Sequence, residues 1–124
     1  MAGAGSFPIR YGALRLLLTV LGMGPGRSGV ELEGERLRVR MGWAFRATIP
    51  VDGITGARPR QGLVGGIGVH GWRGRWLVNG ATTGLVVLAV DPTVRAWATG
   101  VPVQLRELTL SLEDPDGFLA ALGR

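Results

Sequence analysis

Hydrophobic and polar residues alternate one by one through much of the first half of the chain. Residues 36–41 read Arg-Leu-Arg-Val-Arg-Met, so three apolar side chains share one face of an extended backbone and three arginines share the other. The same alternation runs through residues 30–33 and 45–49. A period of two is typical of strands with one buried face. The pattern therefore predicts a three-strand antiparallel meander over residues 29–50.

The first turn of this meander is predicted at residues 33–34. A two-residue turn there would place Glu31 opposite Arg36 and Val30 opposite Leu37, so that both faces of the hairpin agree.

The second turn is predicted as a three-residue loop at residues 42–44. That length pairs Met41 with Phe45 and keeps the apolar side chains together. A two-residue loop would bring an arginine onto the core face, since a slip of one residue exchanges the faces. The same register places Arg40 directly opposite Arg46.

The remaining pattern predicts further strands. The longest apolar run, residues 16–23, is too short to span a membrane as a helix and is predicted to be a buried first strand. Residues 1–6 are expected to be frayed. Later predictions are a short strand at 54–58, a loop at 60–71, a hairpin of strands 72–78 and 85–90, a break at Asp91-Pro92, a loop at 92–102 and a last strand at 107–113.

A helix is predicted to follow the last strand. Asp114 suits the N-cap position, Pro115 the first helical position, and Asp116 the positive end of the helix dipole. Phe118, Leu119 and Leu122 would share one face, and Gly123 would end the helix.

Length and composition fit one domain spanning residues 1–124. The chain has no cysteine, which excludes disulfides and thiolate metal sites. Its net charge is +5, and all fourteen basic residues are arginine. Codon bias in a GC-rich genome would also produce this composition, so the charge favours anionic partners only mildly.

The usual catalytic groups are scarce. His70 is the single histidine, and a triad of Ser111, His70 and Asp52 would put its nucleophile in the middle of a strand. Residues 66–71 match the glycine pattern of dinucleotide-binding loops, but the residues that follow predict a strand where that motif needs a helix. We therefore expect no cofactor, no metal and no enzymatic activity.

The arginine face of the meander is the candidate binding site. Arg38, Arg40 and Arg46 share this face, and Trp43 lies at the tip of the adjoining loop. Two interpretations stay open: a solvated strand face, or an anion site for phosphate, an acidic protein segment or anionic lipid. A second cluster at residues 72–76 interleaves arginine with tryptophan, and is interpreted as two core tryptophans with Arg73 and Arg75 outward rather than as a platform for nucleobases.

Two segments together resemble bacterial pleckstrin-homology-like (PH-like) domains. Residues 37–54 are similar in having a strand, a tight glycine turn, a returning strand with arginine and an Ile-Pro step, and residues 111–122 in having a closing strand, an Asp-Pro cap and a short helix. The resemblance implies a mainly β fold: a strongly bent antiparallel sheet, or partly open barrel, of about seven strands with one short C-terminal helix.

These observations lead to a non-enzymatic binding or scaffolding domain as the expected function. The first expectation is protein–protein interaction, including self-association. The alternative is peripheral binding of an anionic membrane or phosphate ligand through the arginine-rich strand face, while nucleic acid is disfavoured as a partner. The expected location is the cytoplasm, with peripheral attachment to a membrane under the alternative.

Overall fold

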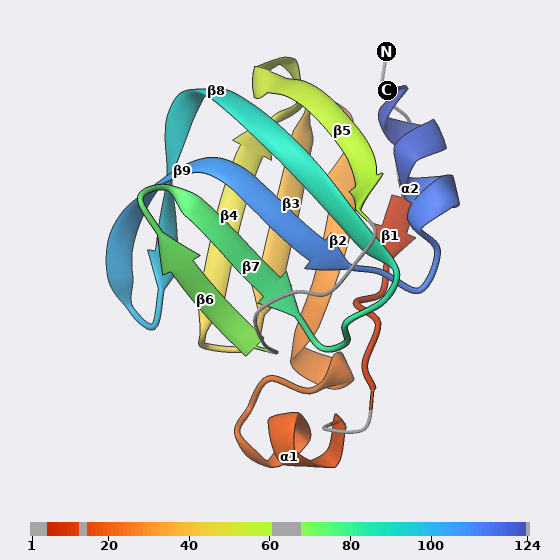
Figure 1. Cartoon of the computed structure of the whole chain (residues 1–124), viewed down its shortest axis with the longest axis vertical. Coiled ribbons are helices and arrows are strands. Elements are labelled where there is room, and N and C mark those ends of the chain that lie inside the picture. The colour runs from red at the N-terminus through yellow and green to blue at the C-terminus, as the bar shows by residue number, and fades with distance from the viewer. Residues whose placement is uncertain (1–4, 13–14, 61–67, 124) are drawn as a thin grey trace.

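The protein folds as one strongly curled sheet that wraps into a half-barrel, as a computed structural model shows (Figure 1). The structure describes residues 5–12, 15–60 and 68–123. Its described strands and helices, in chain order, are β1 (Gly5–Phe7), α1 (Arg15–Val20), β2 (Ser28–Glu33), β3 (Arg36–Met41), β4 (Phe45–Pro50), β5 (Ile54–Arg60), β6 (Gly68–Trp72), β7 (Arg75–Asn79), β8 (Leu85–Ala98), β9 (Val101–Ser111) and α2 (Pro115–Leu122). The predicted fold class, mainly β with a bent, partly open barrel and a short C-terminal helix, is confirmed.

The strands follow the order β1-β2-β3-β4-β8-β9-β7-β6, and β5 pairs with β8 outside this path. The described residues thus form nine strands, where about seven were predicted. One pair, β7 with β9, is parallel, and the other neighbours are antiparallel. The helix α2 packs at the edge of the barrel beside β1 (Figure 1), where the rings of Phe118 and Phe7 meet edge to face at 5.3 Å.

The meander of β2, β3 and β4 has the predicted faces. The second turn is confirmed, since Met41 pairs with Phe45 and Arg40 with Arg46. The predicted first turn is wrong by one position: the turning residues are Gly34 and Glu35, and Gly34 has a positive φ of 60°.

Moving that turn shifts the pairing of the first hairpin by two residues, which leaves every side chain on its predicted face. The apolar side chains of the meander are accordingly buried: Val30, Leu32, Leu37, Val39, Met41, Phe45, Ala47 and Ile49.

The predicted hairpin between residues 72–78 and 85–90 is wrong. The strand β9 lies between β7 and β8, because β7 instead turns back on β6 through Arg73 and Gly74. Both residues have positive φ, of 52° and 85°, which is the geometry of a tight two-residue hairpin turn. Residues 68–71 therefore belong to a strand where a loop was predicted, and residues 61–67 of that loop lie outside the described residues.

The predicted break at Asp91-Pro92 and the predicted loop at residues 92–102 are also wrong. The strand β8 continues to Ala98, and β9 begins at Val101. The pairing of β8 with β9 is interrupted only between Ala89 and Val94, so Pro92 sits where the ladder requires no N–H donor. Proline thus marks a bulge here and does not end the strand. Likewise β5, a strand paired on one side only, extends through Pro59 to Arg60 beyond its predicted end.

The apolar run at residues 16–23 was predicted as a buried strand, but its first five residues lie in the helix α1 and the rest follow that helix. Leu18 is the buried residue of this helix. Gly22, at a φ of 85°, ends the helix in a Schellman motif: the Met23 N–H donates to the Leu18 carbonyl at 2.8 Å and the Gly22 N–H to the Thr19 carbonyl at 3.1 Å. The prediction failed because an unbroken apolar run carries no period that separates strand from helix.

Both termini of the described chain are anchored. The prediction that residues 1–6 are frayed is wrong for Gly5 and Ser6, which pair with β2, and residues 1–4 lie outside the described residues. At the other end the predicted helix is confirmed: the Asp114 carboxylate accepts a hydrogen bond from the Gly117 N–H at 3.0 Å, and Gly123 closes the helix with a φ of 74°.

Candidate functional site

Two cross-strand rows of outward-facing residues cross the outer face of the meander. One row runs from Gly29 through Arg40 and Arg46 to Trp97, and crosses β2, β3, β4 and β8 in turn. The next runs from Glu31 through Arg38 to Thr48. Successive side chains of a strand point to opposite faces, so the arginines point outward because the apolar residues between them point into the core.

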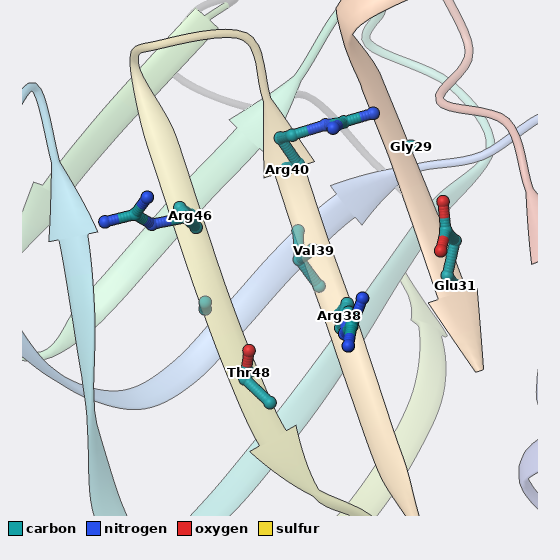
Figure 2. Close-up of a pocket in the computed structure, with 8 residues that line it drawn as sticks. Gly29, Glu31, Arg38, Val39, Arg40, Arg46 and Thr48 are labelled. Carbon is teal, nitrogen blue, oxygen red and sulfur yellow. The ribbon is translucent and has the colours of Figure 1, made fainter. Parts of the chain in front are cut away.

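A shallow hollow of about 400 Å³ lies over these two rows (Figure 2). Its lining comes from all three strands of the meander: Gly29, Glu31, Arg38, Val39, Arg40, Arg46, Ala47 and Thr48. Three of the four predicted site residues therefore surround one depression. We call this surface, with Arg38, Arg40 and Arg46 as its cations, the arginine face.

Arg40 extends sideways over Gly29 of β2 (Figure 2). The space above Gly29 is open, since a Cβ built on this glycine would meet no atom within 4 Å. Arg40 has no carboxylate within ion-pair distance among the residues that the structure describes. Its guanidinium is thus a cation with its hydrogen-bond donors directed to solvent.

Arg46 extends the opposite way, toward β8 (Figure 2). Its guanidinium carbon lies 5.9 Å from the ring centroid of Trp97, a cation–π contact. Trp97 had no assigned place in the sequence interpretation, because the strand that carries it was predicted as a loop. The two facing arginines therefore do not converge on one point as paired forks, but flank the hollow from its two sides.

Arg38 is the arginine of this face that lies within ion-pair distance of a carboxylate among the described residues. Its guanidinium lies 3.9 Å from the Glu33 carboxylate, and both side chains are more than half exposed, so water and salt weaken the pair. The prediction that Glu31 lies opposite Arg36 is wrong, because the register places Glu31 opposite Arg38. Glu31 is instead the acidic residue that lines the hollow.

Trp43, the fourth predicted site residue, lies at the tip of the β3–β4 turn and does not line the hollow. It is exposed over 61% of its surface, and its indole Nε1 donates a hydrogen bond of 2.6 Å to the Leu21 carbonyl. The indole thus bridges the turn to the end of α1, a neighbour that the sequence did not predict.

Of the residues considered for catalysis, Ser111 has a structural role. The Ser111 hydroxyl is buried, accepts from the Gly80 N–H and donates to the Arg10 carbonyl, both at 2.9 Å. Asp52 is exposed. The side chain of His70 lies outside the described residues, as does the first part of the glycine motif at 66–71, whose second part is strand β6.

The tryptophan–arginine cluster at residues 72–76 is only partly described. Trp76 is half-buried and packs near Phe45, with ring centroids 6.2 Å apart, as the core interpretation predicts. Arg73 and Arg75 are exposed, and Arg75 lies 3.8 Å from Glu107. The side chain of Trp72 lies outside the described residues.

No cluster of three or more potential metal ligands occurs within residues 5–12, 15–60 and 68–123. Across the same residues, no helix has the length and apolar character needed to cross a bilayer. In comparisons with known proteins, no family model, no curated protein and no solved structure matches the chain.

Proposed function

We propose that the chain is a non-enzymatic binding domain whose arginine face receives phosphate-bearing anionic ligands. The observation that carries the proposal is the direct opposition of Arg40 and Arg46 across β3 and β4, with no carboxylate paired to either among the described residues. Like charges opposed across strands destabilise a sheet. A bound anion would relieve this repulsion, so binding would also stabilise the fold.

The geometry suits a group larger than one isolated anion. Arg40 and Arg46 lie on opposite sides of the hollow, and Arg38, two residues from Arg40 on β3, lines it further along the strand (Figure 2). Separated guanidinium groups match several phosphates presented together, as on a lipid surface or a polyphosphate chain. The position of Glu31 on the rim disfavours a ligand that fills the whole hollow with negative charge.

The experiment compares two charge-matched double variants. Arg40→Gln/Arg46→Gln removes the opposed pair, and Arg58→Gln/Arg60→Gln removes two exposed arginines from β5. Each protein is titrated with inorganic polyphosphate, with phosphatidylcholine vesicles and with vesicles that also contain phosphatidylglycerol.

The proposal predicts that only the first variant loses binding, by about tenfold or more, since two charge-assisted contacts are removed. If the Arg40→Gln/Arg46→Gln variant loses binding to vesicles alone, the ligand is a lipid headgroup. If it loses binding to both vesicles and polyphosphate, the site recognises phosphate in general. Equal binding by both variants, or equal loss in both, would refute the proposal.

Protein–protein interaction, including self-association, is the second candidate function. It is favoured by the exposed apolar side chains of α1, such as Leu16 and Val20, each 77% exposed. Light scattering at low and high salt separates the two candidates. An apolar interface between proteins persists in salt, whereas binding to phosphate weakens steeply as salt is added.

The resemblance to bacterial PH-like domains also remains a proposal. The curled sheet and the capped C-terminal helix are consistent with it, while the parallel pairing of β7 with β9 departs from the antiparallel sheet that the resemblance implies. A cytoplasmic location is likewise a proposal, and attachment to the inner surface of a membrane follows only if the anionic ligand is lipid.

A further inference from the structure

The helix α1 presents its apolar face to solvent. Leu16 and Val20 are each 77% exposed, Leu17 is 52% exposed and Leu21 is 48% exposed. These residues form two pairs four positions apart, so they share one side of the helix and the adjoining turn. A surface helix normally turns such a face inward, and this one leaves only Leu18 in the core.

The other exposed large hydrophobic residues lie in the β3–β4 turn or on the strands that flank the β8–β9 turn. Within the described part of the chain they are Trp43, Trp97 and Val101. The Trp43 indole joins the β3–β4 turn to Leu21, which directly follows α1. The β3–β4 turn is also joined to the β8–β9 turn, where the Thr99 N–H donates to the Ala44 carbonyl at 2.8 Å. Figure 1 shows α1 and both turns toward the same end of the barrel. We call the seven residues at this end the apolar end: Leu16, Leu17, Val20, Leu21, Trp43, Trp97 and Val101.

Close backbone contacts hold the β3–β4 turn against the segment that follows α1. The Gly42 N–H donates to the Arg27 carbonyl at 2.9 Å, and a Cβ on Gly42 would collide with the Gly22 backbone. The Trp43 indole lies against Gly22, where a Cβ would come within 3.0 Å of the ring. Its N–H is already satisfied by Leu21, so the exposed ring can enter an apolar phase without leaving that donor unpaired.

Charge divides the meander along its length. Arg40 and Arg46 lie next to the turn that carries Trp43, whereas at the turn on the opposite end of β3 Arg36 is opposed by Glu33 and adjoined by Glu35. Arg15 and Arg27, both exposed, add positive charge beside α1. An apolar end with a cationic border complements an anionic bilayer, whose headgroups are negative and whose interior is apolar.

A second copy of the chain fits this end less well. Two apolar ends brought together would also bring together their bordering arginines, in a molecule of net charge +5. Repulsion between the bordering arginines of the two copies opposes association, and burying these charges at the interface adds a desolvation cost. The same arginines favour a bilayer with anionic lipids.

We infer that the apolar end inserts into the headgroup region of an anionic membrane, with α1 lying in the interface and the arginine face contacting lipid phosphates beside it. This inference rests on the proposed function for the phosphate contacts and adds the partner, a bilayer. In an interfacial helix, apolar side chains reach the acyl boundary while the basic side chains stay at headgroup depth.

The test replaces exposed apolar residues and leaves the arginine face intact. Leu16→Ser/Val20→Ser changes two exposed side chains of α1, and Ala120→Ser changes an exposed residue of α2 as a control. Binding is measured on vesicles that contain phosphatidylglycerol and, separately, on inorganic polyphosphate. Light scattering follows the size of each protein in the absence of lipid.

The inference predicts that the α1 variant binds vesicles at least about tenfold more weakly than the wild type and binds polyphosphate equally well. Vesicle binding equal to that of the wild type would overturn the inference and leave the proposed function in place. A wild-type dimer that the α1 variant abolishes would overturn it in favour of self-association. If the Arg40→Gln/Arg46→Gln variant binds polyphosphate and vesicles like the wild type, the proposed function itself fails.

Insertion has a second, optical readout. Acyl chains brominated near the headgroup quench the fluorescence of tryptophan that reaches them. The Trp43→Phe variant should show less quenching than the wild type on the same vesicles, since Trp43 is the most exposed tryptophan at the apolar end. Equal quenching in the two proteins would contradict insertion of this turn.

Discussion

Arg40 and Arg46 occupy directly opposed positions on β3 and β4, yet their guanidinium groups extend toward opposite flanks of the sheet (Figure 2). The Arg40 side chain extends over Gly29, and the ring of Trp97 contacts the Arg46 guanidinium. This divergence lowers the repulsion between the two charges without neutralising either. It leaves a hollow between two cations, which is the arrangement that the proposed function uses.

Removing the acid on the rim of the hollow should strengthen anion binding. In the Glu31→Gln variant, a carboxylate that repels phosphate is replaced by a neutral amide of the same size. We expect affinity for polyphosphate to rise about two- to tenfold at low salt, and the gain to shrink as salt is added. Calorimetric titration measures it. Glu35→Gln, at the far turn, is the matched control, and an equal gain there would mean that only net charge matters.

The β3–β4 turn should tolerate no side chain at Gly42. This residue has a φ of 54°, and a Cβ would overlap the Gly22 carbonyl. We expect Gly42→Ala to lower the free energy of unfolding by more than about 2 kcal/mol, from backbone strain together with displacement of α1. Urea denaturation measures the loss. Gly100→Ala is the control, because that glycine has a similar φ of 81° but no atom near its Cβ position. If both variants lost the same unfolding free energy, the close approach of Gly42 to Gly22 would contribute nothing to the loss.

The buried hydroxyl of Ser111 should contribute to stability. Ser111→Ala leaves the Gly80 N–H and the Arg10 carbonyl without their shared partner. We expect a loss of about 1–3 kcal/mol in the free energy of unfolding, with binding to polyphosphate unchanged. Thermal unfolding and the same titration measure the two effects. A variant as stable as the wild type would show that the two hydrogen bonds contribute nothing net.

Stability should fall in alkaline solution because of Tyr11. The phenol donates to the Met23 carbonyl, and burial raises its pKa above the usual 10.0. The folded state therefore holds this proton more tightly than the unfolded state. The stability that it provides is complete below about pH 10 and is lost as the pH rises through the folded pKa.

The chain suits a test of that dependence, since it has one tyrosine and no lysine. Urea midpoints at about pH 9 and about pH 11 should differ in the wild type and differ much less in Tyr11→Phe. An equal drop in both proteins would assign the effect to another group.

The arginine face was predictable from sequence because its signal is local. Strict alternation between Arg36 and Met41 fixes which side chains point outward, and the length of one loop fixes Arg40 opposite Arg46. The first turn was misplaced by one position, but the two-residue shift in pairing moved no side chain to another face. The arginine face was therefore predicted correctly although the register of the first hairpin was not.

The apolar end could not be predicted, because it depends on contacts between distant segments. An apolar run at residues 16–23 is normally explained by burial, and nothing in its pattern indicates that Leu16 and Val20 face solvent. The place of Trp97 depends on β8 continuing past Pro92, which local propensity opposes. The pairing of β7 with β9 likewise joins segments about 30 residues apart, beyond the reach of turn signals.

The most direct test of the account is a titration with inorganic polyphosphate followed at the Nε–H groups of the arginine side chains by NMR. The account predicts that the Arg40 and Arg46 resonances shift first and saturate together, while those of Arg58 and Arg60 move little. Shifts of equal size across all exposed arginines, without saturation, would contradict it, because they would show only diffuse attraction between a basic protein and an anion.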